Sequence, residues 1–184
     1  GPAVKVTEDE EPGRSDLTKM GSLKPAFQPD GGTVTAANAS KINDGASALV
    51  VMSADEAQKR GLTPLARIKG FAQAAQAPEW FTTAPVAAIQ TLLKKTGLRK
   101  DQIDLWEINE AFAVVALACG ERLGIDLAKV NVNGGAVALG HPIGASGARI
   151  LTTLVHAMID RNVKTGCAAI CIGGGEATAL VLER

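Results

Sequence analysis

Residues 134–149 read Gly-Gly-Ala-Val-Ala-Leu-Gly-His-Pro-Ile-Gly-Ala-Ser-Gly-Ala-Arg, and this stretch is the most informative part of the chain. It places His141 in a glycine-rich turn that leads directly into an apolar helical pattern. A side chain that titrates near neutral pH, backbone N–H groups and a helix N-terminus therefore come together here. This combination suits chemistry on an anionic or oxyanion-forming substrate.

Strands and helices alternate on both sides of this turn. The apolar patterns predict strands over residues 46–53, 65–74, 105–108, 167–172 and 177–182, with a short β-prone segment over 33–36. They predict helices over residues 55–60, 84–95, 110–123 and 146–159, several of which end at a glycine. This alternation, ending in a hairpin, indicates an α/β layered fold.

The composition excludes several classes of partner. The 184 residues are 46% hydrophobic and 21% charged, and 19 basic residues balance 19 acidic ones. A neutral chain of this kind does not favour nucleic acid or a membrane surface, and no segment is long enough to span a bilayer. The three cysteines lack zinc-like pairing, which favours a reducing compartment, and we expect the cytoplasm.

Three positions carry residues suited to chemistry. Asn109 follows the strand predicted over 105–108, where it can cap the next helix or hold a water or a carbonyl oxygen. Glu110 comes next, and its negative charge can interact favourably with the dipole of that helix at its N-terminus. His141 in its turn can be structural or catalytic, because the surrounding glycines match neither a P-loop nor a dinucleotide-binding motif.

The third position is Cys171, where a predicted strand runs into three glycines. Glycines allow backbone N–H groups to approach a ligand closely, and a nearby histidine can activate a thiol. Cys167 lies on the same face of the strand and is predicted to be a core residue, as is Cys119 in its apolar helix. A zinc site built from these cysteines and His141 is a weak alternative, since no fourth ligand is evident.

Taken together, these motifs resemble the C-terminal half of a thiolase of the acetyl-CoA acetyltransferase type. The motifs are Asn109-Glu110-Ala111-Phe112, Gly140-His141-Pro142 and Cys171-x-Gly173. Residues 38–46 (Asn-Ala-Ser-Lys-Ile-Asn-Asp-Gly-Ala) are similar to the family's stretch beside the pantetheine arm of coenzyme A. The resemblance extends from about residue 20 to Arg184 and implies the βαβαβαββ half of a five-layer αβαβα sandwich. Residues 1–32 are then a linker, and 33–184 form the C-terminal domain.

The resemblance also implies roles for individual residues. His141 would activate a nucleophilic cysteine and help to hold the thioester oxygen, and Asn109 would position a water that completes this first oxyanion site. Cys171 would remove a proton from the acetyl methyl group or return it. The backbone N–H of Gly173 would contribute to a second oxyanion site. The nucleophilic cysteine of the family lies in the other half, and no cysteine of this sequence has that context.

Binding roles follow from the same resemblance. Ser40, with Ala36 near it, would line the coenzyme A arm, and Ala111 and Phe112 would border the acyl pocket. Coenzyme A and its acyl thioesters are substrates in this scheme, and no tightly bound cofactor is implied. We expect the chain to need the N-terminal thiolase half, to be inactive without it, and to form a homo-oligomer.

Three alternatives stay open at this point. The chain could be a non-catalytic module that binds acyl-CoA or helps assembly. It could belong to a thiolase that acts on longer 3-ketoacyl-CoA substrates. It could also come from a related condensing enzyme such as a ketoacyl synthase, although the second cysteine, Cys171, argues against this possibility.

Overall fold

The computed structural model describes residues 1–184, which divide into a unit of residues 1–37 and a unit of residues 38–184. The first unit contains the short helix α1 (Glu10–Arg14) and the 3-10 helix η1 (Leu17–Ser22), and neither has a buried residue. Asp9 and Asp16 precede them, and each side chain accepts a hydrogen bond from a backbone N–H of the first turn. These two helices lie where we expected only irregular chain.

A four-stranded mixed sheet forms the centre of the second unit. Its strands lie in the order β1 (Arg67–Ala75), β4 (Glu176–Glu183), β3 (Thr165–Cys171) and β2 (Leu105–Ile108). β4 runs antiparallel to both neighbours, whereas β2 and β3 are parallel. Beyond β2, Val130 forms a single parallel bridge with Trp106, in the position that a fifth strand would occupy. This mixed sheet with its helices confirms the predicted α/β fold class.

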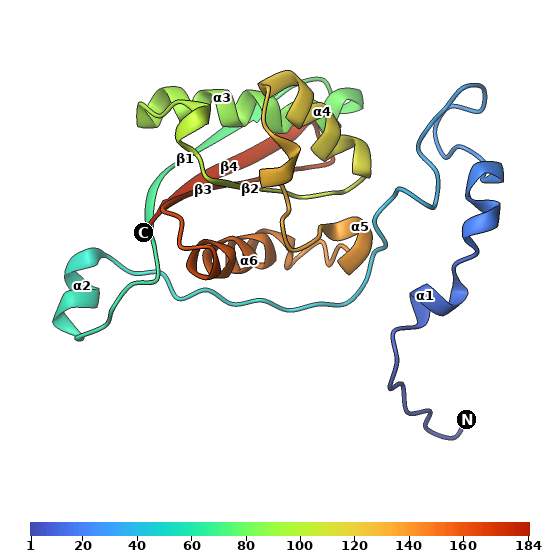
Figure 1. The fold of residues 1–184 in the computed structure, drawn as a ribbon, viewed down its shortest axis with the longest axis horizontal. Coiled ribbons are helices and arrows are strands. Elements are labelled where there is room, and N and C mark those ends of the chain that lie inside the picture. The colour runs from blue at the N-terminus through green and yellow to red at the C-terminus, as the bar shows by residue number, and fades with distance from the viewer. The chain divides into compact units, whose positions relative to one another are not determined.

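Helices cover the two faces of the sheet (Figure 1). Helices α3 (Ala84–Thr96) and α4 (Ala113–Leu123) lie on one face, and α6 (Ser146–Asp160) lies on the other, against β2 and β3. Shorter elements connect them: α2 (Ala54–Lys59), η2 (Pro78–Thr83), η3 (Lys100–Gln102), η4 (Leu127–Lys129) and α5 (Ala136–Leu139).

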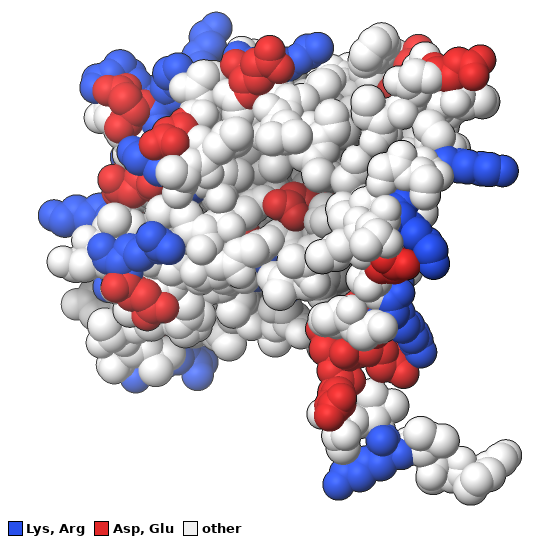
Figure 2. Space-filling view, turned by 45° about the vertical axis from the view of Figure 1, so that its right-hand side comes forward, with Lys and Arg blue, Asp and Glu red and all other residues white.

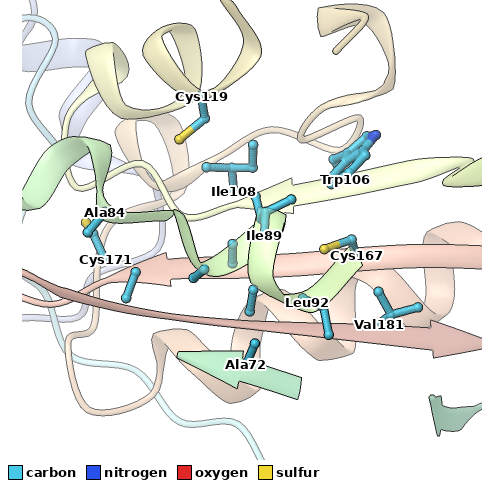
Figure 3. Close-up of a cluster of buried hydrophobic side chains, with 14 of the residues drawn as sticks. Ala72, Ala84, Ile89, Leu92, Trp106, Ile108, Cys119, Cys167, Cys171 and Val181 are labelled. Atoms are coloured by element: carbon cyan, nitrogen blue, oxygen red, sulfur yellow. The ribbon is translucent and has the colours of Figure 1, made fainter. Parts of the chain in front are cut away.

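Side chains alternate across the sheet and form two cores. The larger core joins α3 and α4 to residues such as Ile108, Cys167 and Val181 on one face (Figure 3). The smaller core packs α6 against Leu105 and Leu182 on the other face. Such two-sided burial is typical of a sheet between helical layers.

Two predicted strands do not form, and one predicted helix begins late. Residues 46–53 form no strand, but run as extended chain whose Val50 is 87% exposed, because no neighbouring strand pairs with them here. Residues 33–36 form no strand either. The helix expected to begin at Glu110 begins at Ala113, since the residues before it are held in an irregular loop by contacts described below.

The surface carries charges of both signs. Figure 2 shows Lys, Arg, Asp and Glu side chains interspersed, with a broad uncharged area between them. None of the helices combines the length and apolar character that a bilayer span requires.

Candidate active site

The candidate site lies where the parallel strands β2 and β3 end. Asn109 directly follows β2, and its backbone N–H donates to the carbonyl oxygen of Ala169 on β3 at 2.9 Å. Cys171 is the last residue of β3. The carboxyl ends of two neighbouring strands therefore place Asn109 and Cys171 at the same edge of the sheet, which is the usual position for ligands in α/β folds.

Asn109 contacts the predicted histidine. Its Nδ2 lies 3.4 Å from Nε2 of His141, although the two residues come from different loops. Asn109 is 1% exposed, and its Oδ1 is buried without a hydrogen-bond partner. The alternative that Asn109 caps the next helix is wrong, because Phe112 is the N-cap of α4. A buried amide oxygen of this kind is available to hold a water or another donor.

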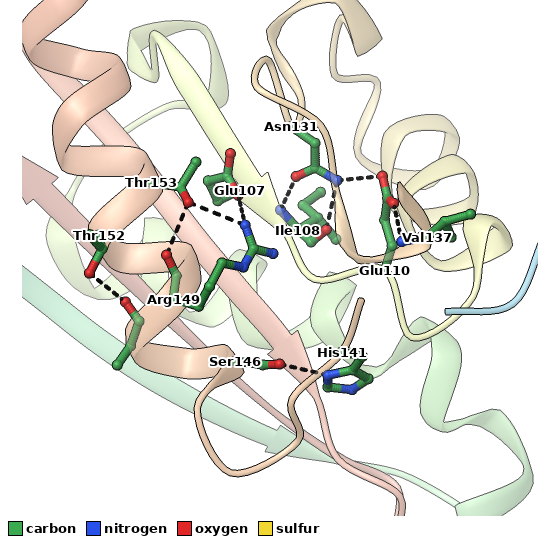
Figure 4. A network of polar contacts seen from close by, with 11 residues as sticks. Glu107, Ile108, Glu110, Asn131, Val137, His141, Ser146, Arg149, Thr152 and Thr153 are labelled. Carbon is green, nitrogen blue, oxygen red and sulfur yellow. Dashed lines mark hydrogen bonds and ion pairs between the residues drawn. The ribbon is translucent and has the colours of Figure 1, made fainter. Parts of the chain in front are cut away.

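A second asparagine connects the Asn109 loop to the histidine loop (Figure 4). The carboxamide of Asn131 accepts from the backbone N–H of Ile108 at 2.8 Å and donates to the carbonyl of Ile108 at 2.9 Å. Its Nδ2 also donates to Glu110 at 2.8 Å, and the other oxygen of Glu110 accepts from the backbone N–H of Val137 in α5. We call these contacts the Asn131–Glu110 brace.

The Asn131–Glu110 brace changes the expected role of Glu110 and adds Asn131 to the residues of the site. Glu110 does not lie in the first turn of α4, but binds the N-terminal turn of α5, which precedes His141. Asn131 was not among the residues predicted to belong to the site. Its signal is the Asn-Val-Asn-Gly-Gly run, since Asn131 adopts a positive φ of 48°, a conformation that asparagine tolerates better than most residues.

The segment beside the site connects the two loops from the other side. Ser40 donates from its hydroxyl to the carbonyl of Ala111 at 2.8 Å, and Ala39 forms an antiparallel bridge with Phe112. The backbone N–H of His141 donates to the carbonyl of Lys41 at 2.7 Å. The structure thus brings Ser40, Ala111 and Phe112 together beside the histidine loop. Ala36, the remaining predicted binding residue, belongs to the unit of residues 1–37.

The cysteines differ in their surroundings. Burial raises the pKa of Cys167 and of Cys119 to about 12, and both lie in the larger core. Burial also raises the pKa of Cys171, which lies at the end of its strand beside exposed chain. Cys171 is therefore a protonated thiol at neutral pH, suited to donating a proton.

Gly173 lies in the exposed turn between β3 and β4. The backbone N–H groups of Ile172 and Gly175 are bonded within this hairpin, whereas that of Gly173 has no such bond. A donor in this position is available to a ligand. No group of three or more His, Cys, Asp or Glu side chains is placed to hold a metal ion.

The electrostatics keep the histidine neutral. Burial lowers the pKa of His141, and the nearby positive charge of Arg149 lowers it further. Arg149 also lies 3.4 Å from the carboxylate of the buried Glu107. Burial raises the pKa of Glu107 to about 7, and the charge of Arg149 opposes this rise. A neutral imidazole faces the site and can act as a base.

Comparison with known proteins identifies the class. The family model described as "Thiolase, C-terminal domain" matches residues 62–184, and "Thiolase, N-terminal domain" matches residues 2–55. The chain belongs to the thiolase family. The two models meet between residues 55 and 62, and the compact unit begins at Asn38, so the domain boundary expected at residue 33 stays a prediction.

Individual relatives share much of the sequence. A probable acetyl-CoA acetyltransferase of Dictyostelium discoideum is 59% identical over 184 residues, which are all of this chain and 44% of the relative. The Acat5 thiolase of Ascaris suum, solved in complex with coenzyme A, is 48% identical with a TM-score of 0.85, over 97% of this chain and 47% of that one. Human mitochondrial 3-ketoacyl-CoA thiolase, solved in complex with CoA, is 45% identical with a TM-score of 0.87, over 92% and 43%. The chain spans less than half the length of these proteins.

Proposed function

We propose that these 184 residues form the C-terminal part of an acetyl-CoA acetyltransferase, which joins two acetyl-CoA molecules into acetoacetyl-CoA and CoA or runs the reverse cleavage. One observation carries the proposal. Asn109 and His141 converge at 3.4 Å, at the sheet edge where β3 ends in Cys171, in a chain 59% identical to a relative of that name.

The proposed chemistry needs a nucleophile from outside this chain. Cys119 and Cys167 are core residues with a pKa of about 12, and Cys171 is assigned another role. The external thiol loses its proton to His141 and attacks the thioester carbonyl, so that the acyl group moves to its sulfur. The coenzyme A thiolate leaves with the proton of the Cys171 thiol. Asn109, through a water, and His141 stabilise the oxyanion that forms.

The second step makes or breaks the carbon–carbon bond. In the condensing direction, Cys171 is a thiolate because it has protonated the leaving coenzyme A, and it removes a methyl proton from the second acetyl-CoA. The carbanion attacks the acyl-enzyme and releases the external thiolate, which regains its proton from His141. In the cleaving direction, the thiol of Cys171 returns that proton. The N–H of Gly173 stabilises the enolate oxygen, and one such fixed donor is worth about 3–4 kcal/mol. Ser40, Ala36, Ala111 and Phe112 border the coenzyme A arm and the acyl pocket in this scheme.

The partner in this proposal is the remaining part of a thiolase N-terminal domain, on the same or another polypeptide. The N-terminal family model reaches into this chain as far as residue 55, and residues 46–53 are extended, apolar and unpaired. An exposed, extended apolar segment of this kind pairs readily with the edge of another sheet. A homo-oligomer and a location in the cytoplasm belong to the same proposal, and size-exclusion chromatography and cell fractionation would test them.

The decisive experiment joins this chain to the N-terminal part of the Dictyostelium relative and measures CoA-dependent cleavage of acetoacetyl-CoA. We expect turnover by the chimera and none by the 184-residue chain alone. Cys171→Ala should lower kcat by about 10²–10⁴-fold, the usual contribution of a general acid–base group. Cys167→Ala, on the same face of the same strand, is the matched control and should keep most of the activity.

Other outcomes would reject the proposal. Robust thiolysis by the isolated chain would show that no external nucleophile is needed. A chimera that binds CoA without turnover would favour the non-catalytic module. Faster cleavage of longer 3-ketoacyl-CoA substrates than of acetoacetyl-CoA would favour a thiolase that acts on longer substrates; the human structural neighbour is named a 3-ketoacyl-CoA thiolase.

A further inference from the structure

Ser146 is the first residue of α6 and makes an unusual pair of contacts. Its side chain is buried, at 1% exposure for the residue, and its Oγ lies 2.6 Å from Nδ1 of His141. The same Oγ lies 3.1 Å from the carbonyl oxygen of Pro142. Figure 4 shows the serine pointing from the start of the helix to the imidazole ring.

The contact with the carbonyl of Pro142 determines the direction in which the Ser146 hydroxyl donates its proton. A carbonyl oxygen can only accept a hydrogen bond, so the hydroxyl proton of Ser146 points to Pro142. The lone pairs of Oγ are then left for His141, and the ring must supply the proton between Nδ1 and Oγ. In a neutral imidazole only one nitrogen carries a proton, so a proton on Nδ1 leaves Nε2 without one.

The other side of the ring agrees with this arrangement. Nε2 lies 3.4 Å from Nδ2 of Asn109, which can only donate. The Oδ1 of Asn109 then stays unpartnered in the interior, where it can accept from a water. In this arrangement every hydrogen bond has one donor and one acceptor: Asn109 donates to Nε2 of His141, Nδ1 donates to Ser146, and Ser146 donates to the carbonyl of Pro142.

We propose that Ser146 is a positioning residue that holds His141 in the Nδ1–H tautomer, so that Nε2 is the basic nitrogen facing the site. Its meaning for catalysis rests on the proposed function, because only Nε2 would then receive the proton of the external thiol. The tautomer itself is a property of this chain and can be measured without substrate, partner or turnover.

A reversed arrangement competes with this one. The carbonyl of Pro142 already accepts from the backbone N–H groups of Ala145 and Ser146, at 2.7 and 2.9 Å. If the hydroxyl proton turned to Nδ1 instead, Nε2 would carry the ring proton, and the carboxamide of Asn109 would have to rotate to accept it. The two arrangements differ in which ring nitrogen is protonated, and an experiment can tell them apart.

The experiment is ¹⁵N NMR of the two histidines in the 184-residue chain, at about pH 8, where an imidazole is neutral. His156→Gln assigns the signals, because His156 lies on α6 and does not belong to the site. We expect Nδ1 of His141 to resonate as the protonated nitrogen and Nε2 as the unprotonated one. Once the signals are assigned, the wild-type spectrum tests the tautomer, so the result does not require that a variant of Ser146 folds.

Two variants test whether Ser146 is the cause. Ser146→Ala should shift the population of His141 toward the Nε2–H tautomer. Thr152→Val is the matched control: it also removes a hydroxyl that donates to a carbonyl one turn earlier in α6, at 2.9 Å from Ala148, but it does not contact His141. We expect the control to leave the His141 signals unchanged.

A protonated Nε2 in the wild type would overturn the proposal, and so would an unchanged tautomer in Ser146→Ala. Failure of the proposed function is separate. An inactive chimera together with an Nδ1–H ring would reject the enzymatic activity and leave the positioning role in place.

Discussion

Strand β3 and the segment of residues 46–53 have similar sequences and different structures. Both are short runs of small and apolar residues, Thr-Gly-Cys-Ala-Ala-Ile-Cys in β3 and Ala-Ser-Ala-Leu-Val-Val-Met-Ser in the segment. β3 lies between β2 and β4, pairs with both and is largely buried. The segment is extended and unpaired. An apolar run therefore becomes a strand only where neighbouring strands satisfy its backbone groups.

The largest effect expected from this contrast is in hydrogen exchange. Amides of residues 167–170 should exchange only on global unfolding, and those of residues 46–53 should exchange at nearly unprotected rates, several orders of magnitude faster. Mass spectrometry of peptides from the isolated chain measures both. Protection of residues 46–53 in the isolated chain would contradict this contrast. Protection that appears only in the chimera would show that the missing partner strand is what residues 46–53 lack.

A matched pair of valines gives the next largest effect. Val181 on β4 is fully buried and Val50 is 87% exposed. Val181→Ala should lower the free energy of unfolding by about 1.5–3 kcal/mol, because it removes buried methyl groups and leaves a cavity. Val50→Ala should change it by less than about 0.5 kcal/mol. Urea denaturation measures both, and equal losses would contradict the contrast.

The smallest expected effect is the pH dependence of the free energy of unfolding that the buried carboxyl of Glu107 causes. The pKa of Glu107 rises from 4.5 to about 7 on folding, so between these values the native state binds more protons than the unfolded chain. Stability from this group is fully present below about pH 4.5 and is lost as the pH rises to about 7. Glu107→Gln should remove this loss, which is on the order of 1–3 kcal/mol, in denaturation experiments at about pH 5 and about pH 8.

Glu183 supplies the control for that experiment. Hydrogen bonds from Lys69 and then Arg67 lower its pKa, so its contribution is lost as the pH falls instead of as it rises. Glu183→Gln should therefore leave the window between about pH 5 and about pH 8 unchanged. A Glu107→Gln profile parallel to that of the wild type would show that the buried carboxylate is already paired.

Sequence patterns predicted the elements that depend on local signals. The strand over 105–108 is confirmed to the residue, and α3 ends at Gly97, which takes the left-handed conformation that favours glycine. The motifs around Asn109 and His141 identified two residues that the fold does bring together. These signals lie within short stretches, so they can be read from this single sequence without related sequences beside it.

The errors share a different cause. Residues 46–53 need partner strands that no pattern within the segment reveals. Helix α4 begins late because Ser40 and Ala39, distant in the sequence, bond to Ala111 and Phe112. Ser146 reads as an ordinary helix start, and its contact with His141 depends on how the turn folds back. Contacts between distant residues decide these features, and the periodicity of a single segment does not contain them.

The Asn131–Glu110 brace links two positions in the evolution of the chain. A Cβ atom at Gly135 would lie about 2.1 Å from the carboxyl carbon of Glu110, so any larger residue would displace the carboxylate from α5. A shorter acid at position 110 would open the space that such a residue needs. Changes at these two positions should therefore be inherited together, and a variant at either one should be tolerated mainly when the other has already changed.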